Sequence, residues 1–397
     1  MKKNTLQSNL KKNIYRLKHW ETWPWLIKYI PMIPFWILHC IRARSCWFFT
    51  AANPTLTFGG YEGENKMEMY KRLPEGTYPR TRYICTTASD TEVEAQAMCF
   101  NFPVAVKPDV GRMGLMFRKI HSLQELLEYH GKMKVDYLLQ EYIPYPLEVS
   151  VFYYRFPNNV KGTITGFVRK ECLSITGNGV SNLYELMLKY PRVQFRLEEM
   201  KIKHATSLKH VIPCGENFVL CDALNLSRGG KLVSLEHEKD EKLLEFFDNL
   251  SHVGDFYFGR YDIKCRSIDD LKNGKNFSIL EFNGSGAEPH HVYGDGNSLL
   301  KAIKILLEHW HILFQISVLN NKKGVPYWGF LRGVRHLLKA RKHFKKLRAL
   351  EFKSFNEIQT DNQKTKREVH HYALTLNKQE SHEIRSVDRK EVQGISG

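Results

Sequence analysis

The sequence lacks any pair of cysteines at the spacing of a metal or redox site. Its eight cysteines are scattered along 397 residues, and no two of them form a Cys-x-x-Cys pair. This argues against a zinc site and against a disulfide scaffold, so we expect buried free thiols in a reducing cytosol. The chain also has no apolar run followed by a small-residue cleavage site, so we expect no signal peptide and a cytoplasmic protein.

Acidic residues are scarce in two segments, and these segments account for most of the net charge of +17. Residues 1–50 hold nine Lys/Arg against one acid, and residues 331–350 hold eight Lys/Arg and no acid. The basic character therefore belongs to the two ends of the chain, and the central region is near neutral. Basic ends indicate an acidic partner surface, either anionic lipid or nucleic acid. Nucleic acid is the less favoured partner because no recognition motif is present.

A long uninterrupted apolar run is also missing near the start of the chain. Residues 23–40 (WPWLIKYIPMIPFWILHC) are apolar and aromatic but contain Lys28 and three prolines. The segment is barely long enough to span a bilayer, and its aromatic content with flanking Lys/Arg is typical of an element lying at a membrane interface. A helical hairpin packed on the protein's own core is an equally good interpretation. Both remain open.

The pattern of apolar residues predicts an α+β protein, because strands alternate with helices and also form hairpins. With 43% hydrophobic residues the chain can bury a sizeable core. We expect a basic aromatic segment over 1–50, a folded domain over 51–320, a basic amphipathic helix over 331–352 and a disordered tail over 354–397. The expected strands are 103–107, 115–120, 137–141, 148–155, 161–169, 256–264 and 277–283, and the expected helices are 91–100, 122–130, 183–189, 240–250 and 298–319.

The helix over 331–352 has two interpretations, as the N-terminal segment does. A basic amphipathic helix can pack on its parent domain with a solvated face, or it can contact an anionic membrane. With eight positive charges and no acid over 331–350, we favour the membrane. This would place the protein at the inner membrane face as a peripheral protein.

The strongest chemical signal is the segment LEFNGSG, residues 280–286. On a strand, Glu281 and Asn283 point to the same face. A hairpin would bring Asp262, in the preceding strand, next to them. Carboxylate and amide oxygens suit Mg²⁺, which is usually shared with nucleotide phosphates. The alternative is a surface carboxylate pair, but the apolar flanks of Glu281 favour burial, and a buried carboxylate without a cation is costly.

Two further segments are weaker evidence for a nucleotide site when each is taken alone. Lys107 ends the apolar strand of FPVAVKPDVGRMG, so its ammonium needs an anion such as phosphate, and Gly111 and Gly114 allow backbone N–H groups to approach phosphate oxygens. In LLQEYIPYPLEVSV, residues 141–143 offer backbone groups and an apolar wall to a purine, and Glu148 could bond a ribose. The alternative for the Lys107 segment is an ordinary hairpin, and the alternative for the Glu148 segment is an ordinary strand–turn–strand.

The order of these segments resembles the ATP-grasp superfamily over roughly residues 53–300. Residues 175–187 (ITGNGVSNLYELM) look like the G-D-G-x-x-T-x-x-E-L stretch of cyanophycin synthetase, and residues 225–230 (NLSRGG) are similar to an Asn-x-Ser-x-Gly-Gly element. D-alanine–D-alanine ligase and glutathione synthetase belong to the same branch. The resemblance implies two α+β lobes that hold a nucleotide between two antiparallel sheets.

The resemblance also implies residue roles. The nucleotide-binding positions are Lys66 and Lys107 for phosphate, Gly111, Arg112 and Gly114 for a flap over the phosphates, Glu141, Tyr142 and Ile143 for adenine, and Glu148 for ribose. The metal ligands are Asp262, Glu281 and Asn283, and the catalytic cations are Arg169 and Arg228.

This sequence departs from the family pattern in three places. Arg112 and Met113 interrupt a glycine loop that is usually longer, Asn178 replaces the acid of G-D-G, and only the basic segment precedes Asn53, where the family has a substrate lobe. The departures leave the acceptor undefined, and the sequence does not indicate the oligomeric state.

The activity that the resemblance implies is that of a Mg-ATP-dependent ligase, with Mn²⁺ as an alternative metal. A small-molecule or peptide carboxylate would be activated as an acyl phosphate and attacked by an amine. The alternatives are a kinase-like phosphotransferase and a non-catalytic nucleotide- or membrane-binding protein with a degenerate site. Retention of all three metal ligands argues against the degenerate site.

Overall fold

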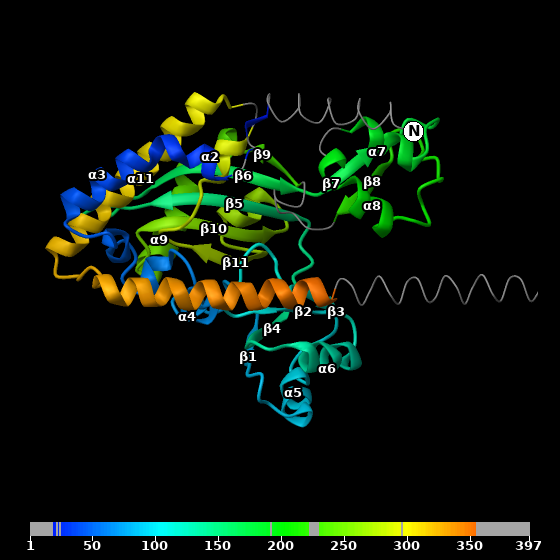
Figure 1. The fold of residues 1–397 in the computed structure, drawn as a ribbon, viewed down its shortest axis with the longest axis horizontal. Coiled ribbons are helices and arrows are strands. Elements are labelled where there is room, and N and C mark those ends of the chain that lie inside the picture. Colours follow the sequence, from blue (N-terminus) through cyan, green and yellow to red (C-terminus); the bar gives the residue numbers. More distant parts are fainter. Residues whose placement is uncertain are drawn as a thin grey trace, which may run out of the picture. The chain divides into compact units, whose positions relative to one another are not determined.

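The computed structural model describes residues 19–20, 23, 25–190, 193–221, 230–294 and 297–354 (Figure 1). The chain divides into two compact units, Met1–His343 and Phe344–Gly397. The described part of the second unit, residues 344–354, is helical. The predicted disordered tail lies outside the described residues except for its first residue, Ser354. Everything below concerns the first unit.

A four-stranded antiparallel sheet forms the smaller of the two main sheets. Its order is β1 (Thr81–Ile84), β4 (Tyr137–Glu141), β2 (Val104–Pro108) and β3 (Arg118–Ile120). Two helices follow strands of this sheet, α5 (Asp90–Ala97) and α6 (Leu123–Lys132). Each helix begins at a serine whose side chain accepts a backbone N–H, which satisfies a donor that the first turn leaves open.

A five-stranded antiparallel sheet forms the centre of the unit. Its order is β11 (Phe277–Asn283), β10 (Phe258–Cys265), β5 (Leu147–Tyr154), β6 (Thr163–Glu171) and β9 (Lys231–Ser234). One face packs on α9 (Glu241–Gly254), where Val151, Tyr261 and Phe247 share the main core. Part of the other face packs on α11 (Leu299–Lys322) through Phe152 and Leu313. This is the two-sheet α+β arrangement that the family resemblance implies.

A third, two-stranded sheet has a core of its own. It pairs β7 (Leu173–Thr176) with β8 (Asn217–Cys221) and carries α7 (Leu183–Lys189), η5 (Val193–Arg196) and α8 (Leu197–Lys203). Asn178, which replaces the usual acid, lies in the turn before α7. Its Oδ1 accepts the backbone N–H groups of Val180 and Ser181 at 3.0 and 2.7 Å. The amide therefore holds this turn without a carboxylate.

The N-terminal segment is helical but broken at its prolines. Its described elements are α2 (Trp25–Tyr29), η2 (Ile30–Met32), α3 (Ile33–Ala43), η3 (Phe48–Ala51), η4 (Thr57–Gly60) and α4 (Lys66–Tyr70). η2 and α3 each have a proline in the first turn, where its missing N–H leaves no bond unmade. α3 contacts α11 on one side and is exposed on the other. The segment thus packs on the protein's own core and keeps an outer face.

The remaining elements are short except for one. They are η7 (Glu236–Glu238), α10 (Ile268–Lys272), η8 (His290–Tyr293) and a helix over 330–354 that continues into the second unit. Among the described residues, one helix, α11, is long and apolar enough to cross a membrane by length and composition. Asn320 of α11 is buried and donates to the Ala51 carbonyl at 2.9 Å, so this helix is part of the packed unit.

Most predicted elements are present, several with the predicted bounds. The strands over 137–141 and 277–283 and the helix over 183–189 agree with β4, β11 and α7. The strand predicted over 115–120 is wrong for its first half, because Met113, Gly114 and Met116 have positive φ and form turns before β3 begins. The short strands β1, β7, β8 and β9 were not predicted.

Candidate nucleotide and metal site

The β10–β11 hairpin brings the predicted metal ligands together. Asp262 and Glu281 are direct cross-strand partners, and Arg260 faces Asn283 in the same register. Because side chains alternate along a strand, these residues belong to one side of the pleat, and Asp262, Arg260 and Asn283 are in direct contact. A register shift after Asp262 leaves Leu280 between two pairs, which turns its carbonyl toward neighbouring side chains.

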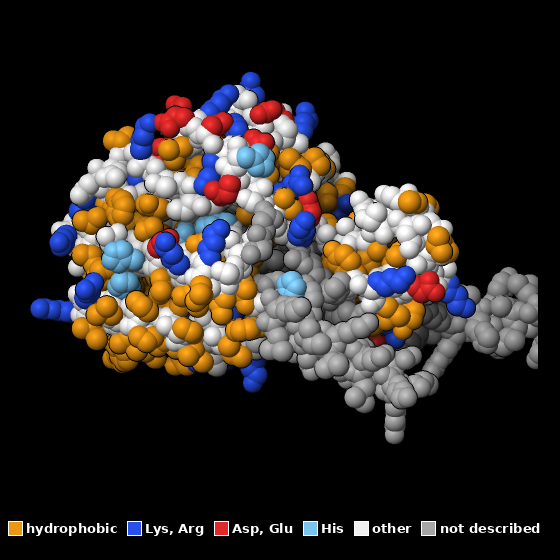
Figure 2. Space-filling view, turned by 90° about the horizontal axis from the view of Figure 1, so that it is seen from above, with side chains coloured by type: hydrophobic (Ala, Val, Ile, Leu, Met, Phe, Trp, Pro, Cys, Tyr) orange, Lys and Arg blue, Asp and Glu red, His pale blue; other side chains and the backbone are white. Residues whose placement is uncertain are grey.

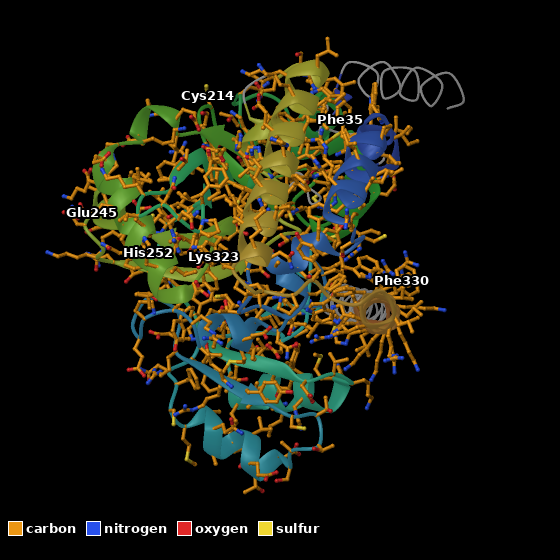
Figure 3. The ribbon with its side chains drawn as sticks, turned by 90° about the vertical axis from the view of Figure 1, so that its left-hand side faces the viewer. Phe35, Cys214, Glu245, His252, Lys323 and Phe330 are labelled. Atoms are coloured by element: carbon orange, nitrogen blue, oxygen red, sulfur yellow. The ribbon has the colours of Figure 1, made fainter. Side chains whose placement is uncertain are left out.

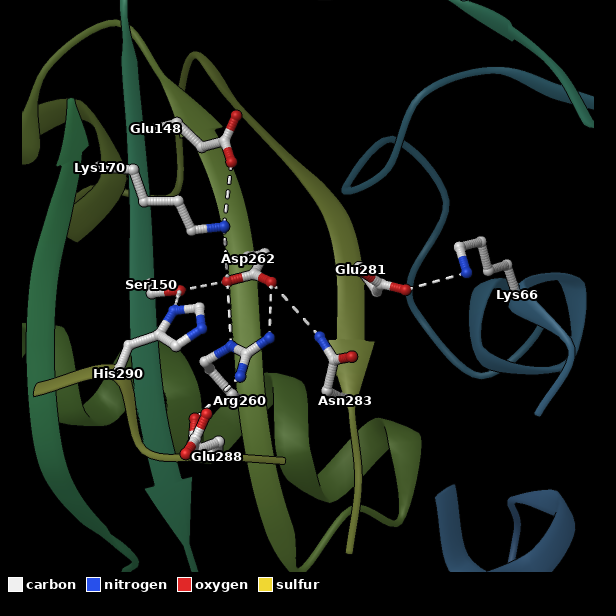
Figure 4. Close-up of polar contacts among 10 residues, drawn as sticks. All are labelled: Lys66, Glu148, Ser150, Lys170, Arg260, Asp262, Glu281, Asn283, Glu288 and His290. Carbon is white, nitrogen blue, oxygen red and sulfur yellow. Dashed lines mark hydrogen bonds and ion pairs between the residues drawn. The ribbon is translucent and has the colours of Figure 1, made fainter. Parts of the chain in front are cut away.

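Asp262 lies at the centre of a charged network (Figure 4). Its carboxylate contacts Lys170 at 3.0 Å, Arg260 at 3.1 Å and the Asn283 amide at 3.3 Å, and it accepts the Ser150 hydroxyl. Its burial acts to raise its pKa, but the two cations hold the pKa well below its ordinary value. The carboxylate is therefore ionised at any physiological pH.

Lys66 and Glu281 form the second pair of the site. The Lys66 ammonium lies 2.9 Å from a Glu281 oxygen and also donates to the Gly111 carbonyl at 3.0 Å. Burial is the largest single effect and acts to lower the pKa of Lys66, but the Glu281 and Glu64 carboxylates act against it and the net pKa is raised. The pair connects α4 and the glycine loop to the edge strand of the large sheet, and the phosphate-binding role of Lys66 stays a prediction.

Lys107 differs from Lys66 because its hydrogen-bond partners are neutral. Its ammonium donates to the Tyr70 hydroxyl at 2.9 Å and to the Leu280 carbonyl at 3.1 Å. Burial lowers the pKa of Lys107 to about 7, and the nearby Lys66 ammonium acts in the same direction. An anion that enters the site would therefore stabilise the charged form of Lys107.

The glycine loop lies beside these lysines. Its backbone is turned by Met113 and Gly114, both with positive φ, so a glycine suits the second position. Arg112 forms an ion pair with Glu62 at 2.8 Å. Gly111 contributes its carbonyl to Lys66. These contacts place the loop at the site, and its role as a flap stays a prediction.

The predicted adenine segment follows β4. Tyr142 and Ile143 are partly buried, while Glu141 is exposed. The Lys119 ammonium lies 4.3 Å from the centre of the Tyr142 ring, and the Lys264 ammonium lies 5.8 Å from it. The Tyr142 ring and the two cations beside it form a surface that is partly apolar and partly charged. This geometry is compatible with a nucleotide, and the adenine assignment stays a prediction.

Glu148 and Arg169 lie in other surroundings than those predicted for them. Glu148 forms an ion pair with Lys170 at 3.0 Å, so it belongs to the charged network. Arg169 faces Val149 in register and pairs with Glu171, whereas Lys170 reaches Asp262. Since neighbouring residues of a strand point to opposite faces, Lys170 lies on the site face and Arg169 does not. Lys170, and not Arg169, therefore lies beside Asp262, while the catalytic role predicted for Arg169 stays a prediction.

Arg260 was not among the predicted site residues, and one prediction cannot be located. Arg260 precedes Asp262 by two residues, so strand alternation alone could have placed it on the same face. His290 is 3.0 Å from the Ser150 hydroxyl, and burial holds the pKa of His290 well below its ordinary value, so the ring is neutral. No sequence signal marks that contact. Arg228 lies outside the described residues.

The donor atoms fit a divalent metal of the hard class. Asp262, Glu281 and Asn283 offer only carboxylate and amide oxygens on adjacent strands, which suits Mg²⁺ or Mn²⁺ with further oxygens from water or phosphate. Within the described ranges no three His, Cys, Asp or Glu side chains are grouped to hold a metal without such help. The metal assignment therefore stays a prediction tied to nucleotide binding.

No protein-family model and no curated protein matches the chain. Among solved structures, it is similar to a bifunctional glutathione synthetase from Pasteurella multocida, with 14% identity and a TM-score of 0.39 over 61% of this chain and 35% of that one. It is similar to a D-alanine–D-alanine ligase from Bacillus anthracis, with 10% identity and a TM-score of 0.39 over 65% and 69%. It is also similar to the ATP-grasp ligase PsnB complexed with minimal precursor, with 11% identity and a TM-score of 0.34 over 62% and 60%.

The matched region spans about a third of the glutathione synthetase.

Proposed function

We propose that this protein binds Mg-ATP between its two main sheets and uses it to activate a carboxylate for attack by an amine. One observation carries the proposal. Lys107, on β2 of the smaller sheet, is held by two neutral oxygens beside Lys66, and Lys170 and Arg260 lie on the larger sheet at Asp262. Lys66, Lys170 and Arg260 already pair with carboxylates, so a bound polyphosphate would chiefly supply the anion that Lys107 lacks.

The first step would be a phosphoryl transfer. A carboxylate oxygen of the substrate attacks the γ-phosphorus, the bond from that phosphorus to the β–γ bridging oxygen breaks, and ADP leaves with the electron pair. The protein orients the reactants and offsets the negative charge that builds up on the transferred group. Lys66 and Lys107 would do this at the phosphates.

The second step would be acyl transfer. The amine nitrogen attacks the carbonyl carbon of the acyl phosphate, the C–O bond to phosphate breaks, and the nitrogen loses a proton. Arg260 and Lys170 would supply positive charge to the leaving phosphate and to the carbonyl oxygen. When bound, Mg²⁺ would supply charge neutralisation of the phosphate oxygens.

Binding of ATP with and without Mg²⁺ tests the proposal. Titration calorimetry would compare the wild type with Glu281→Gln, which removes one predicted metal ligand and keeps the shape of the side chain. We expect ATP affinity to rise with Mg²⁺ in the wild type, and the Mg²⁺-dependent part to fall about tenfold or more in the variant.

A matched control is Glu245→Gln, since Glu245 is an exposed acid of α9, which packs on the other face of the large sheet. It should bind ATP as the wild type does. ATP binding that is indifferent to both Mg²⁺ and Glu281 would refute the metal assignment. Absence of ATP binding by the folded wild type would refute the proposed function.

A further inference from the structure

The outer face of α2, η2 and α3 is apolar and exposed. Seven large side chains of this segment are between 42% and 67% exposed. We call them the α2–α3 apolar face: Ile27, Ile30, Ile33, Phe35, Ile37, Leu38 and Ile41. Figure 2 shows hydrophobic side chains gathered along the lower left of the view, where these helices lie. Contiguous apolar surface of this kind marks an interaction site on a folded protein.

This face is presented by a helix that the fold holds in place. Met32 is fully buried, and the His39 ring stacks on Phe314 of α11 with centroids 4.5 Å apart. The 11 residues of α3 are roughly 16 Å long, about half the thickness of a bilayer core. The helix is therefore suited to lying along a surface, and it is too short to cross a membrane.

The charged side chains that this N-terminal segment itself carries are of one sign. No Asp or Glu occurs between residues 22 and 61, and exposed Arg42 and Arg44 lie at the end of α3. Trp47, just beyond, donates to the Phe330 carbonyl at 3.1 Å and stacks on that ring, which places α3 near the start of the helix at 330–354. Phe35 and Phe330 lie on the same side in Figure 3.

The start of the neighbouring helix adds more positive charge. Arg332, Arg335 and Lys339 are exposed there, and no acid occurs in residues 331–350. Long basic side chains can keep their charge among lipid headgroups while their stems lie on apolar surface. The apolar face and its basic border therefore offer the two attractions that hold a protein on an anionic bilayer.

We propose that the α2–α3 apolar face docks on an anionic lipid membrane, with α3 lying in the plane of the interface. A second copy of this chain is a poorer occupant. A two-fold contact through this face would bring the Arg and Lys borders of both copies together, and neither segment holds an acid to neutralise them. Anionic headgroups supply the missing negative charge.

Co-sedimentation of the full chain with vesicles tests this. The vesicles would be phosphatidylcholine alone or a mixture with phosphatidylglycerol. We expect binding to the anionic vesicles, weakened by salt because headgroup charges are screened. The double variant Ile37→Glu/Ile41→Glu should lower the partition coefficient at least tenfold. Both side chains are exposed, so the variant should keep the circular dichroism spectrum of the wild type.

Two further variants sharpen the test. Arg332→Gln/Arg335→Gln keeps the apolar face and should reduce only the preference for anionic over neutral vesicles. Val253→Glu places an acid at another exposed apolar side chain, on α9, and should bind vesicles as the wild type does. Equal binding to both vesicle types, no binding, or full binding by the Glu variant would overturn the proposal. Self-association that the Glu variant abolishes, without vesicle binding, would assign the face to a second copy and overturn it too.

Discussion

Around Asp262, the two faces of the large sheet are built from the same strands but have opposite chemistry. On β5, Val151 lies in the main core while its neighbour Ser150 bonds to the site carboxylate. On β10, Ile263 lies in that core while its neighbour Asp262 binds two cations. One residue of offset separates the core from the site, because successive side chains of a strand point to opposite faces.

The difference shows where stability and function are held. The core face stabilises the fold by removing apolar area from water, at about 25 cal/mol per Å². The site face holds ionised groups whose desolvation offsets much of their mutual attraction. Removing a core side chain should therefore cost stability alone. Removing one site charge should cost stability and also leave its partners unpaired.

The largest expected effect is the substitution Asp262→Ala. It leaves Lys170 and Arg260 buried without their shared anion, which should lower the free energy of unfolding by about 3–5 kcal/mol. Because the pKa of Asp262 is depressed in the folded protein, this stabilisation is present above the ordinary Asp pKa and is lost as the pH falls through the folded value. Urea unfolding at neutral pH measures the change.

A double-mutant cycle separates the two faces in the same assay. Adding Arg260→Met to Asp262→Ala should recover part of the loss, because one unpaired cation is removed. Ile263→Ala by itself should lower the free energy of unfolding by about 2–5 kcal/mol. Adding Arg260→Met to it should recover none of that loss. Strict additivity in both pairs would contradict the charged network.

The next effect compares two neighbours on β6. Lys170→Ala should weaken Mg-ATP binding or turnover by about tenfold to a hundredfold, because it removes a charge-assisted contact on the site face. Arg169→Ala should change it by less than about threefold, the scatter of a substitution away from the site. Equal losses, or a larger loss for Arg169, would restore the assignment made from the sequence. Circular dichroism checks that both variants are folded.

The smallest effect is a proton taken up on binding. Lys107 has a pKa of about 7 in the free protein, so at pH 8 it is mostly neutral. A bound polyphosphate favours the charged form and raises this pKa, so binding at pH 8 should take up as much as one proton. At pH 6 Lys107 is already charged and contributes no uptake.

Calorimetry in two buffers of different ionisation enthalpy measures this uptake. Lys107→Arg is the control, since arginine stays charged throughout and should abolish the difference between pH 6 and pH 8. Uptake that persists in Lys107→Arg would assign the proton to another group. If the wild type took up the same number of protons at pH 6 and at pH 8, the pKa of Lys107 would lie elsewhere.

Sequence patterns located most of the long elements but few of the short ones. β4, β11 and α7 agree with the predicted bounds because each is an apolar or capped run of clear period. The four residues of β1 or β9 carry no such period. β3 was predicted too long because Met113 and Met116 adopt positive φ, which a sequence rarely signals for methionine.

The site was predicted in part for the same reason. Asp262, Glu281 and Asn283 follow from strand alternation and a hairpin, which are local rules, and Lys66 follows from the order of the motifs. The sequence pointed to Arg169 instead of Lys170, because two adjacent basic residues cannot be told apart until the register of the strand is known.

The sequence by itself determined which residue types gather in which segment. It determined that acids are missing around the N-terminal helices and that an acid pair lies on neighbouring strands. Only the tertiary structure decided which face each side chain takes. It placed Lys170 and Arg260 on Asp262, left Lys107 with neutral partners, and turned one side of α3 outward. The physical reason is that composition and period are local, whereas pairing, burial and pKa arise from groups that only folding brings together.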